Sequence, residues 1–322
     1  MAQLGVKDIG KKVKAQGAFT QLGLVIALAL MVAAISIAKP VFLRPENLIN
    51  VLRQVSMNGI LAVGMTLVIL TGGIDLSVGS LVAVTGVISG YMLLQGAGWF
   101  VAVAVSILSA VLFGLFNGTL IAYCGLPPFI ATLACQTIGR GFALLFSDGK
   151  PFAISNKAFL DIGKGSILGI PTPIWILAAV CLIAAVVLNF STFGRHVYAF
   201  GGNRNATKLA GIKTRFLELM VYVIVALMSG ITGVILAARI SSGQPTAGTG
   251  FELDAIAAVA IGGTSMAGGV GRLSGTILGF IIIGVLSNAL TLLEVNSFWQ
   301  PVVKGFIIIG AVLIDLRSKR KE

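Results

Sequence analysis

Long apolar runs separated by short polar segments dominate this sequence. A helix needs about 20 residues to cross the roughly 30 Å hydrocarbon core of a membrane. Ten stretches approach or reach that length, and they lie near residues 21–38, 55–71, 77–95, 99–122, 128–147, 172–190, 216–238, 253–266, 273–293 and 299–316. The pattern therefore predicts an all-α polytopic membrane protein with about ten transmembrane helices.

Glycine interrupts or marks several of these stretches. In the eighth, residues 253–261 are apolar for barely half a membrane thickness before Gly262 and Gly263 follow. We predict a broken helix that still crosses, with an unwound Gly-rich middle that the surrounding protein shields. The GxxxG pairs at 114–118 and 275–279 indicate places where two helix backbones approach closely.

The distribution of basic residues predicts the orientation. Cytoplasmic loops of membrane proteins carry an excess of Lys and Arg, and the connection 191–215 contains no acidic residue. With ten crossings, the Lys-rich segment 1–20 and the basic tail 317–322 both lie in the cytoplasm, and residues 21–316 form a single membrane domain. The basic residues of the connection are Arg195, Arg204, Lys208, Lys213 and Arg215.

Composition supports a membrane protein and excludes several other functions. Hydrophobic residues make up 57% of the 322 and charged residues 11%, whereas soluble domains contain about 25% charged residues. The net charge of +12 comes without a basic stripe interleaved with aromatics, so we expect no nucleic-acid partner. The three cysteines form no CxxC pair, and His196 is the only histidine. We therefore expect no metal site, no cofactor and no His-based catalysis.

Three acidic residues stand next to two predicted span starts. Asp75 lies between two long apolar spans, where an unpaired carboxylate costs several kcal/mol. It either N-caps the following helix or lines a polar path through the membrane. Thr249-x-x-Glu252 has the spacing of a capping box at the start of the eighth span, with Asp254 in the same first turn.

Two basic residues fall inside predicted spans. Arg140 is in the fifth and Lys304 in the tenth. Long basic side chains in such positions either extend toward the membrane surface or pair with a carboxylate. Neither position by itself demands a functional role.

A short helix is predicted within the cytoplasmic connection. Asn203 has the residue type of an N-cap and Gly211 that of the first residue beyond a helix C-terminus, about two turns later. From the pattern alone, this helix is either an ordinary amphipathic connector or a surface that contacts a partner.

Six motifs, most of them Gly-rich, follow one another along the chain. They are Gly64-Met-Thr-Leu-Val-Ile-Leu-Thr-Gly-Gly-Ile-Asp-Leu-Ser-Val-Gly79, Phe193-Gly-Arg, Ala199-Phe-Gly-Gly-Asn203, Gln244-Pro-Thr-Ala-Gly-Thr-Gly250, Glu252-Leu-Asp-Ala-Ile-Ala-Ala258 and Gly262-Gly-Thr-Ser265. In their order and wording these motifs resemble the ribose-type monosaccharide permeases of ATP-binding-cassette (ABC) importers. The resemblance runs from about Phe42 to the last span.

This resemblance implies a set of partners. In that family the permease dimerises in the bacterial inner membrane, binds a cytoplasmic ATP-binding subunit that is often two fused nucleotide-binding halves, and receives sugar from an extracytoplasmic binding protein. The chain contains no G-x-x-x-x-G-K-[ST] loop, so ATP hydrolysis requires such a partner. The resemblance implies that the short cytoplasmic helix is the coupling helix, which docks on the ATPase. In this loop the family often has an acidic residue followed by two alanines, whereas this chain has Arg204-Asn205-Ala206-Thr207. The implied coupling residues are Asn203, Arg204, Asn205, Ala206, Thr207, Lys208, Leu209 and Gly211.

A passage for a neutral sugar requires hydrogen-bonding side chains that bind weakly. Polar residues in or beside spans are candidates, although the same residue types also join transmembrane helices to each other. The candidates for the path are Asn58, Thr66, Asp75, Ser77, Asn117, Gln136 and Asn288.

Other functions stay open at this point. Permeases for branched-chain amino acids, autoinducers or nucleosides have a related architecture. An ion-coupled secondary transporter is a further alternative, but such carriers are expected to place acidic or His relays within their spans, and we take Asp75 as the acid that lies near mid-chain apolar sequence. The sequence therefore favours the ATP-driven permease.

Overall fold

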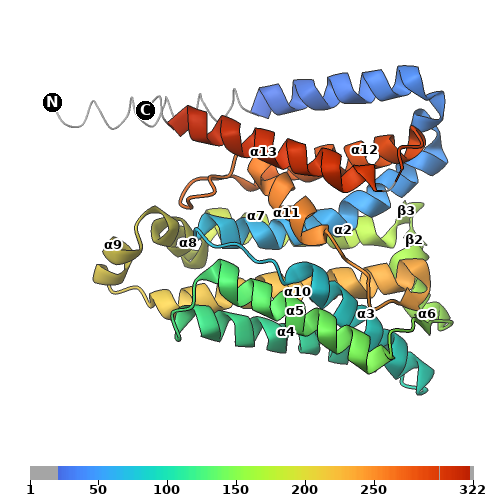
Figure 1. Ribbon diagram of the computed structural model, residues 1–322, viewed down its shortest axis with the longest axis horizontal. Helices are drawn as coiled ribbons and strands as arrows, with labels where there is room; N and C mark the ends of the chain where they lie inside the picture. Colours follow the sequence, from blue (N-terminus) through green and yellow to red (C-terminus); the bar gives the residue numbers. More distant parts are fainter. Residues whose placement is uncertain (1–20, 297, 320–322) are drawn as a thin grey trace.

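The computed structural model describes residues 21–296 and 298–319. They form a bundle of helices that run along the long axis of the molecule (Figure 1). The predicted segment 1–20 and residues 320–322 of the predicted tail lie outside the described residues. The helices are Gln21–Ala38, η1 (Pro40–Leu43), α2 (Pro45–Leu70), α3 (Val78–Leu94), α4 (Trp99–Ala122), α5 (Pro128–Ser147), α6 (Lys157–Lys164), α7 (Thr172–Phe190), α8 (Thr192–Gly202), α9 (Arg204–Leu209), α10 (Thr214–Ile240), α11 (Phe251–Ile261), α12 (Leu273–Leu292) and α13 (Trp299–Lys319).

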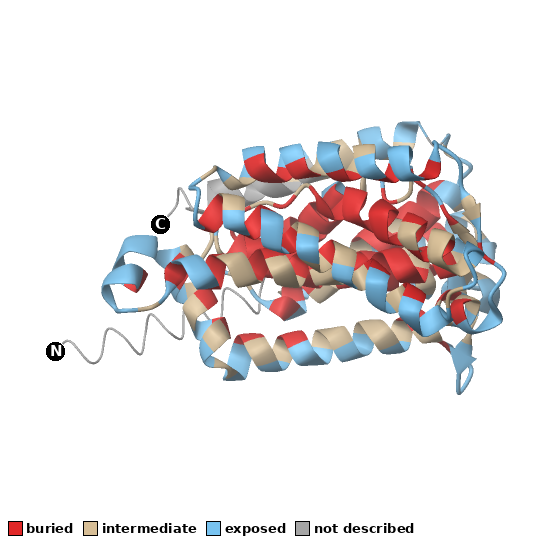
Figure 2. Cartoon of the chain, turned by 90° about the horizontal axis from the view of Figure 1, so that it is seen from below, coloured by how far each residue is buried: buried red, intermediate tan, exposed pale blue. Residues whose placement is uncertain are grey.

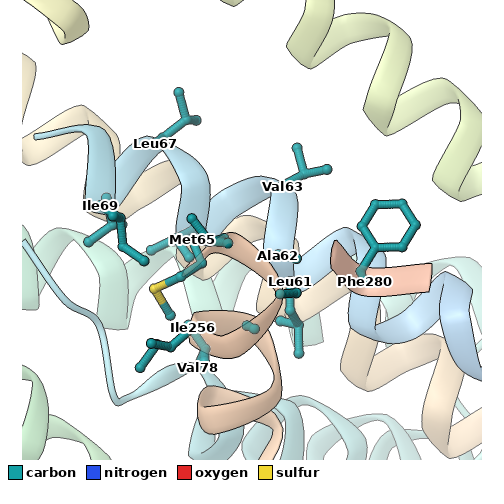
Figure 3. Packing of buried hydrophobic residues seen from close by; sticks show 14 of the residues in the cluster. Leu61, Ala62, Val63, Met65, Leu67, Ile69, Val78, Ile256 and Phe280 are labelled. Atoms are coloured by element: carbon teal, nitrogen blue, oxygen red, sulfur yellow. The ribbon is translucent and has the colours of Figure 1, made fainter. Parts of the chain in front are cut away.

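Helix α2 lies at the centre of the bundle. In its most apolar window 83% of the residues are buried, compared with 22% in α4 and 6% in the first helix. A helix that is apolar around its whole circumference is stable when other helices surround it. Met65 of α2 packs with Val78 of α3 and Ile256 of α11, and Phe280 of α12 belongs to the same cluster (Figure 3). Buried residues accordingly fill the middle of the molecule, with exposed ones around it (Figure 2).

Two non-helical segments enter the bundle. Residues 71–77 turn back from the end of α2, and residues 244–250 enter from the opposite end, after β4 (Ser242–Gly243). In Figure 1 each segment runs part of the way along the bundle before its helix, α3 or α11, begins. The two helix starts meet: a Cβ at Gly79 would lie 2.5 Å from the carbonyl oxygen of Gly248. Helices α3 and α11 therefore begin inside the protein and run in opposite directions.

Short strands close the end of the bundle opposite α8 and α9 (Figure 1). β1 (Phe152–Ala153) pairs antiparallel with β4, and β2 (Ser166–Ile167) pairs antiparallel with β3 (Ile170–Pro171). The β1–β4 pair rests on the end of α3, because a Cβ at Gly90 would lie 2.8 Å from Cβ of Phe152 and 3.5 Å from Cα of Gly243. This pair fixes the start of the entering segment 244–250.

The GxxxG pairs do mark close helix contacts, as predicted. A Cβ at Gly114 of α4 would lie 2.5 Å from Cβ of Ala226 in α10, and one at Gly118 would lie 3.0 Å from the carbonyl oxygen of Leu219. On α12, Cβ atoms at positions 275 and 279 would collide with the backbone of α11. Glycine at these positions allows α10 and α11 to touch their neighbours backbone to backbone.

The predicted fold class is confirmed as an all-helical, polytopic membrane protein. Among the described residues, seven helices are long and apolar enough to cross a membrane, and α3 is a shorter apolar helix. The seven are Gln21–Ala38, α2, α4, α5, α7, α10 and α12. Helices α11 and α13 occupy the other two predicted ranges. The prediction that the eighth span continues as a helix after a Gly-rich break is wrong: α11 ends at Ile261 and residues 262–272 are non-helical. The backbone before α11 is non-helical as well.

We expect Gly114→Val to destabilise the bundle, because the added side chain meets Ala226 of α10 at less than contact distance. Overpacking of this kind costs about 1–3 kcal/mol. Gly141→Val on α5 is the matched control, since a Cβ at Gly141 meets nothing within 4 Å. Melting temperatures of the two purified variants measure the effect. Equal melting temperatures would show that α4 and α10 do not need this close approach.

Candidate functional site

Asp75 is buried where segment 71–77 joins α3. The residue is only 1% exposed. Its Oδ1 accepts hydrogen bonds from the backbone N–H (2.8 Å) and the hydroxyl (2.6 Å) of Ser77. Asn117 of α4 donates its Nδ2 to the Ser77 hydroxyl oxygen at 3.3 Å. The prediction that Asp75 is the N-cap is wrong by two residues, because Ser77 occupies the N-cap position. Asp75 instead holds the turn that leads into the helix.

Glu252 is buried at the start of α11. Gln136 of α5 donates its Nε2 to Oε1 of Glu252 at 3.1 Å, whereas Oε2 has no hydrogen-bond partner and lies against Gly79 of α3. The predicted capping box is absent. The N-cap is Gly250, in the left-handed conformation, and the Thr249 hydroxyl donates to the carbonyl oxygen of Thr246 instead. Glu252 therefore faces the start of α3.

Arg140 fastens the entering segment 244–250 to α5. Its NH1 donates to the carbonyl oxygens of Pro245 (2.7 Å) and Ala247 (2.9 Å), and its NH2 lies 3.5 Å from the carbonyl oxygen of Gly79. An extended segment inside a bundle has carbonyls without helical partners, and the guanidinium supplies the missing donors. Sequence reasoning missed this role, since it considered only carboxylates or the membrane surface as partners for Arg140.

A separate charged group joins α2, α11 and α13. Lys304 of α13 forms an ion pair with Asp254 of α11, with 2.8 Å between Nζ and Oδ1, and both side chains are largely buried. Asn58 of α2 donates to the same carboxylate at 3.4 Å. Of the two alternatives expected for Lys304, the structure shows pairing with a carboxylate.

The path candidates fall into several places rather than one. Asp75, Ser77 and Asn117 form one network. Gln136 joins Glu252 beside it, because Glu252 lies against Gly79, two residues after Ser77. The other three candidates bond elsewhere. Thr66 shares a 2.9 Å hydrogen bond with Thr276, Asn288 bonds with Asn47, and Asn58 bonds with Asp254.

The connection 191–215 contains two helices, α8 and α9, that extend beyond the end of the bundle (Figure 1). Asn203 is the N-cap of α9, as predicted, and its Oδ1 accepts the N–H of Ala206 at 2.9 Å. Gly211 follows the helix with a φ of 80°, also as predicted for a residue that ends a helix. Leu209 at the end of α9 is 89% exposed, whereas Thr207 is 4% exposed.

An ion pair connects α9 to the bundle. Arg204 NH2 lies 2.6 Å from Oε2 of Glu218 in α10, and the Glu218 side chain is 6% exposed. The Arg204 guanidinium also lies 5.0 Å from the ring centre of Phe200 in α8. Beside this pair is a hollow of about 400 Å³, lined by the α4–α5 loop and by polar residues that include Lys208 and Arg215.

The part of the chain that the structure describes offers few potential metal ligands close to one another. There, no three His, Cys, Asp or Glu side chains are grouped so as to hold a metal ion. The three cysteines are free thiols that differ in exposure: Cys124 is exposed, Cys135 is buried and Cys181 is half-buried.

Comparison with known proteins identifies the family. Residues 47–312 match the family described as "Branched-chain amino acid transport system / permease component". The chain belongs to this family of permeases. Together with its apolar helices, this membership makes the permease a multi-pass protein of the inner membrane.

Similar curated proteins cover nearly the whole permease. It is 45% identical to the ribose import permease protein RbsC of Bacillus subtilis (strain 168), over 96% of each chain. It is also 45% identical to RbsC of Escherichia coli (strain K12), over 91% of this chain and 93% of the relative. The L-arabinose transport system permease protein AraH of the same strain is 38% identical, over 94% of this chain and 92% of the relative. No solved structure matches the permease.

We expect Arg140→Gln to loosen segment 244–250, because the carbonyls of Pro245 and Ala247 lose their donor. Hydrogen bonds to a charged group contribute about 1.5–3 kcal/mol each. The measurement is hydrogen–deuterium exchange of peptides covering 244–250, which should be faster in the variant. Peptides covering β2 and β3 should not change, and Lys150→Gln, an exposed substitution, is the control. Unchanged exchange at 244–250 would contradict the role of Arg140.

Proposed function

We propose that this permease is the membrane subunit of an ATP-driven importer for a monosaccharide, with ribose as the first candidate. The observation that supports the sugar most strongly is the 45% identity to ribose import permeases across more than nine-tenths of the chain, against 38% to the arabinose permease. Permeases for a branched-chain amino acid, an autoinducer or a nucleoside remain the alternatives within the same family.

The proposed path passes the point where α3 and α11 begin. Asp75, Ser77 and Asn117 on one side and Gln136 and Glu252 on the other place hydroxyl, amide and carboxylate groups in the interior of the bundle. Interrupted helices at the midplane commonly form the substrate site of transporters. Uncharged donors and acceptors suit a polyhydroxylated solute that must be released again.

The proposed orientation has ten crossings and both termini in the cytoplasm. Under it α8 and α9 face the cytoplasm, in agreement with their excess of basic residues. The permease then pairs with a second copy, with an ATP-binding-cassette subunit at α9, and with an extracytoplasmic sugar-binding protein at the opposite end, where β2 and β3 lie.

Uptake should require the partner ATPase. Liposomes that contain the permease alone should accumulate no labelled ribose, because the chain has no phosphate-binding loop. Liposomes that also contain the ATPase and the binding protein should accumulate ribose when ATP is supplied, and an ATPase whose phosphate-binding lysine is replaced is the control. Collapsing proton and sodium gradients should have no effect.

The outcomes of this experiment separate the hypotheses. Accumulation by the permease alone, driven by an ion gradient, would identify a secondary transporter. ATP-dependent accumulation of an amino acid or nucleoside instead of ribose would support an ATP-driven importer but contradict the proposal that its substrate is a sugar.

Stiffness of α9 should matter for coupling. We expect Leu209→Pro to disrupt the last turn of α9, because proline removes a helical N–H and its ring collides with the preceding turn, at a cost of about 3 kcal/mol. Sugar-stimulated ATP hydrolysis and transport should then fall together, while the variant still inserts in normal amounts. Leu209→Ala keeps the helix but removes the exposed side chain, so comparing the two separates stiffness from direct contact. Wild-type transport by Leu209→Pro would show that α9 is only a connector.

A further inference from the structure

Among the described residues, the Arg204–Glu218 ion pair is the salt bridge that joins α9 to the transmembrane bundle. Arg204 is oriented on two sides, by the Glu218 carboxylate at 2.6 Å and by the Phe200 ring at 5.0 Å. Its side chain is 54% exposed, whereas the Glu218 side chain is 6% exposed. The cation therefore belongs to the surface helix and the anion to the interior of the bundle.

Separating this pair is unfavourable for a physical reason. A buried carboxylate without its cation loses both its charge partner and a strong hydrogen bond. Movement of α9 that keeps the pair intact must therefore move α10 with it. The hollow of about 400 Å³ beside Arg204 leaves room for α9 to shift toward the α4–α5 loop without first displacing packed side chains.

Helix α10 continues the connection into the bundle. Tyr222 is one helical turn beyond Glu218, is 1% exposed, and places its hydroxyl against Gly73, where any Cβ would collide with it. Gly73 belongs to the entering segment 71–77, which also carries Asp75 and Ser77. A shift of α10 along or about its axis would therefore press directly on the segment that leads into α3.

We propose that the Arg204–Glu218 ion pair transmits movement of α9 to α10 and, through Tyr222, to segment 71–77. The inference rests on the proposed function, because it takes α9 as the surface that contacts the ATPase. In this chain the pair involves an arginine, Arg204, in the loop where the family that the sequence resembles often has an acidic residue followed by two alanines. Arg204 and Glu218 are thus positioning residues that act through other groups and touch no solute.

The test compares Glu218→Gln, Arg204→Gln and the double variant in liposomes with the ATPase and the binding protein. The readout is the number of sugar molecules imported per ATP hydrolysed, measured beside co-purification of the ATPase and the melting temperature. Coupling between distant sites commonly amounts to 5-fold or more, so Glu218→Gln should lower sugar per ATP by at least about 5-fold. Because Glu218 is buried and does not reach a partner, the ATPase should still co-purify. The double variant should be no worse than the more severe single variant, since both remove the same contact.

Arg215→Gln is the matched control. Arg215 lines the same hollow but stacks near Tyr123 rather than pairing with an acid, so its loss should leave sugar per ATP unchanged. The proposal is overturned if Glu218→Gln keeps the wild-type ratio, if it loses the ATPase, or if the effects of the two single substitutions add in the double variant. Each of these results is obtained with a wild type that imports sugar by ATP hydrolysis, so failure here is distinct from failure of the proposed function.

Discussion

Hydrogen bonding of the backbone inside hydrocarbon is the constraint on which the rest of this structure depends. No water is present there to satisfy free N–H and C=O groups, so a membrane helix can be interrupted only where the protein supplies partners. Segments 71–77 and 244–250 are two such interruptions, and each has its own donors. Arg140 serves the carbonyls of segment 244–250, and the N–H of Gly269 and the hydroxyl of Thr132 serve the carbonyls of Leu70 and Ile74 around segment 71–77.

The same constraint explains why so many polar residues of the interior are not free to serve a substrate. Lys304 and the amide nitrogen of Asn58 both bond with Asp254, and Thr66 bonds with Thr276. Burying such groups is tolerable because each has a partner. Several buried side-chain atoms of the described residues have no hydrogen-bond partner, among them Oε2 of Glu252 and Oδ1 of Asn117. These two lie close to the first turn of α3, so this part of the interior has unused hydrogen-bonding capacity.

The sequence predicted the helix positions well because hydrophobic runs and caps are local signals. Asn203 and Gly211 bracket α9 as expected, since a cap is decided by a few neighbouring residues. The interruption before α11 was not predicted, because Gln244 to Gly250 is stabilised by Arg140, which lies more than a hundred positions earlier. Asp75 and Thr249 were misassigned as caps for a related reason. Their motifs fit a helix start, but the backbone enters both helices by a different route.

The two non-helical segments connect the interior of the permease to both ends of the helix bundle. At one end of the bundle, segment 244–250 follows directly after the β1–β4 pair. At the other end, α9 forms an ion pair with the N-terminal part of α10, and Tyr222 of α10 contacts segment 71–77. The two segments meet where Gly79 touches Gly248, and glycine is required there because any side chain would collide. A displacement that starts at either end of the molecule therefore arrives at the same contact. That geometry suits a protein that has to alternate access to one interior site, because closing one side and opening the other then depend on a single set of touching backbones.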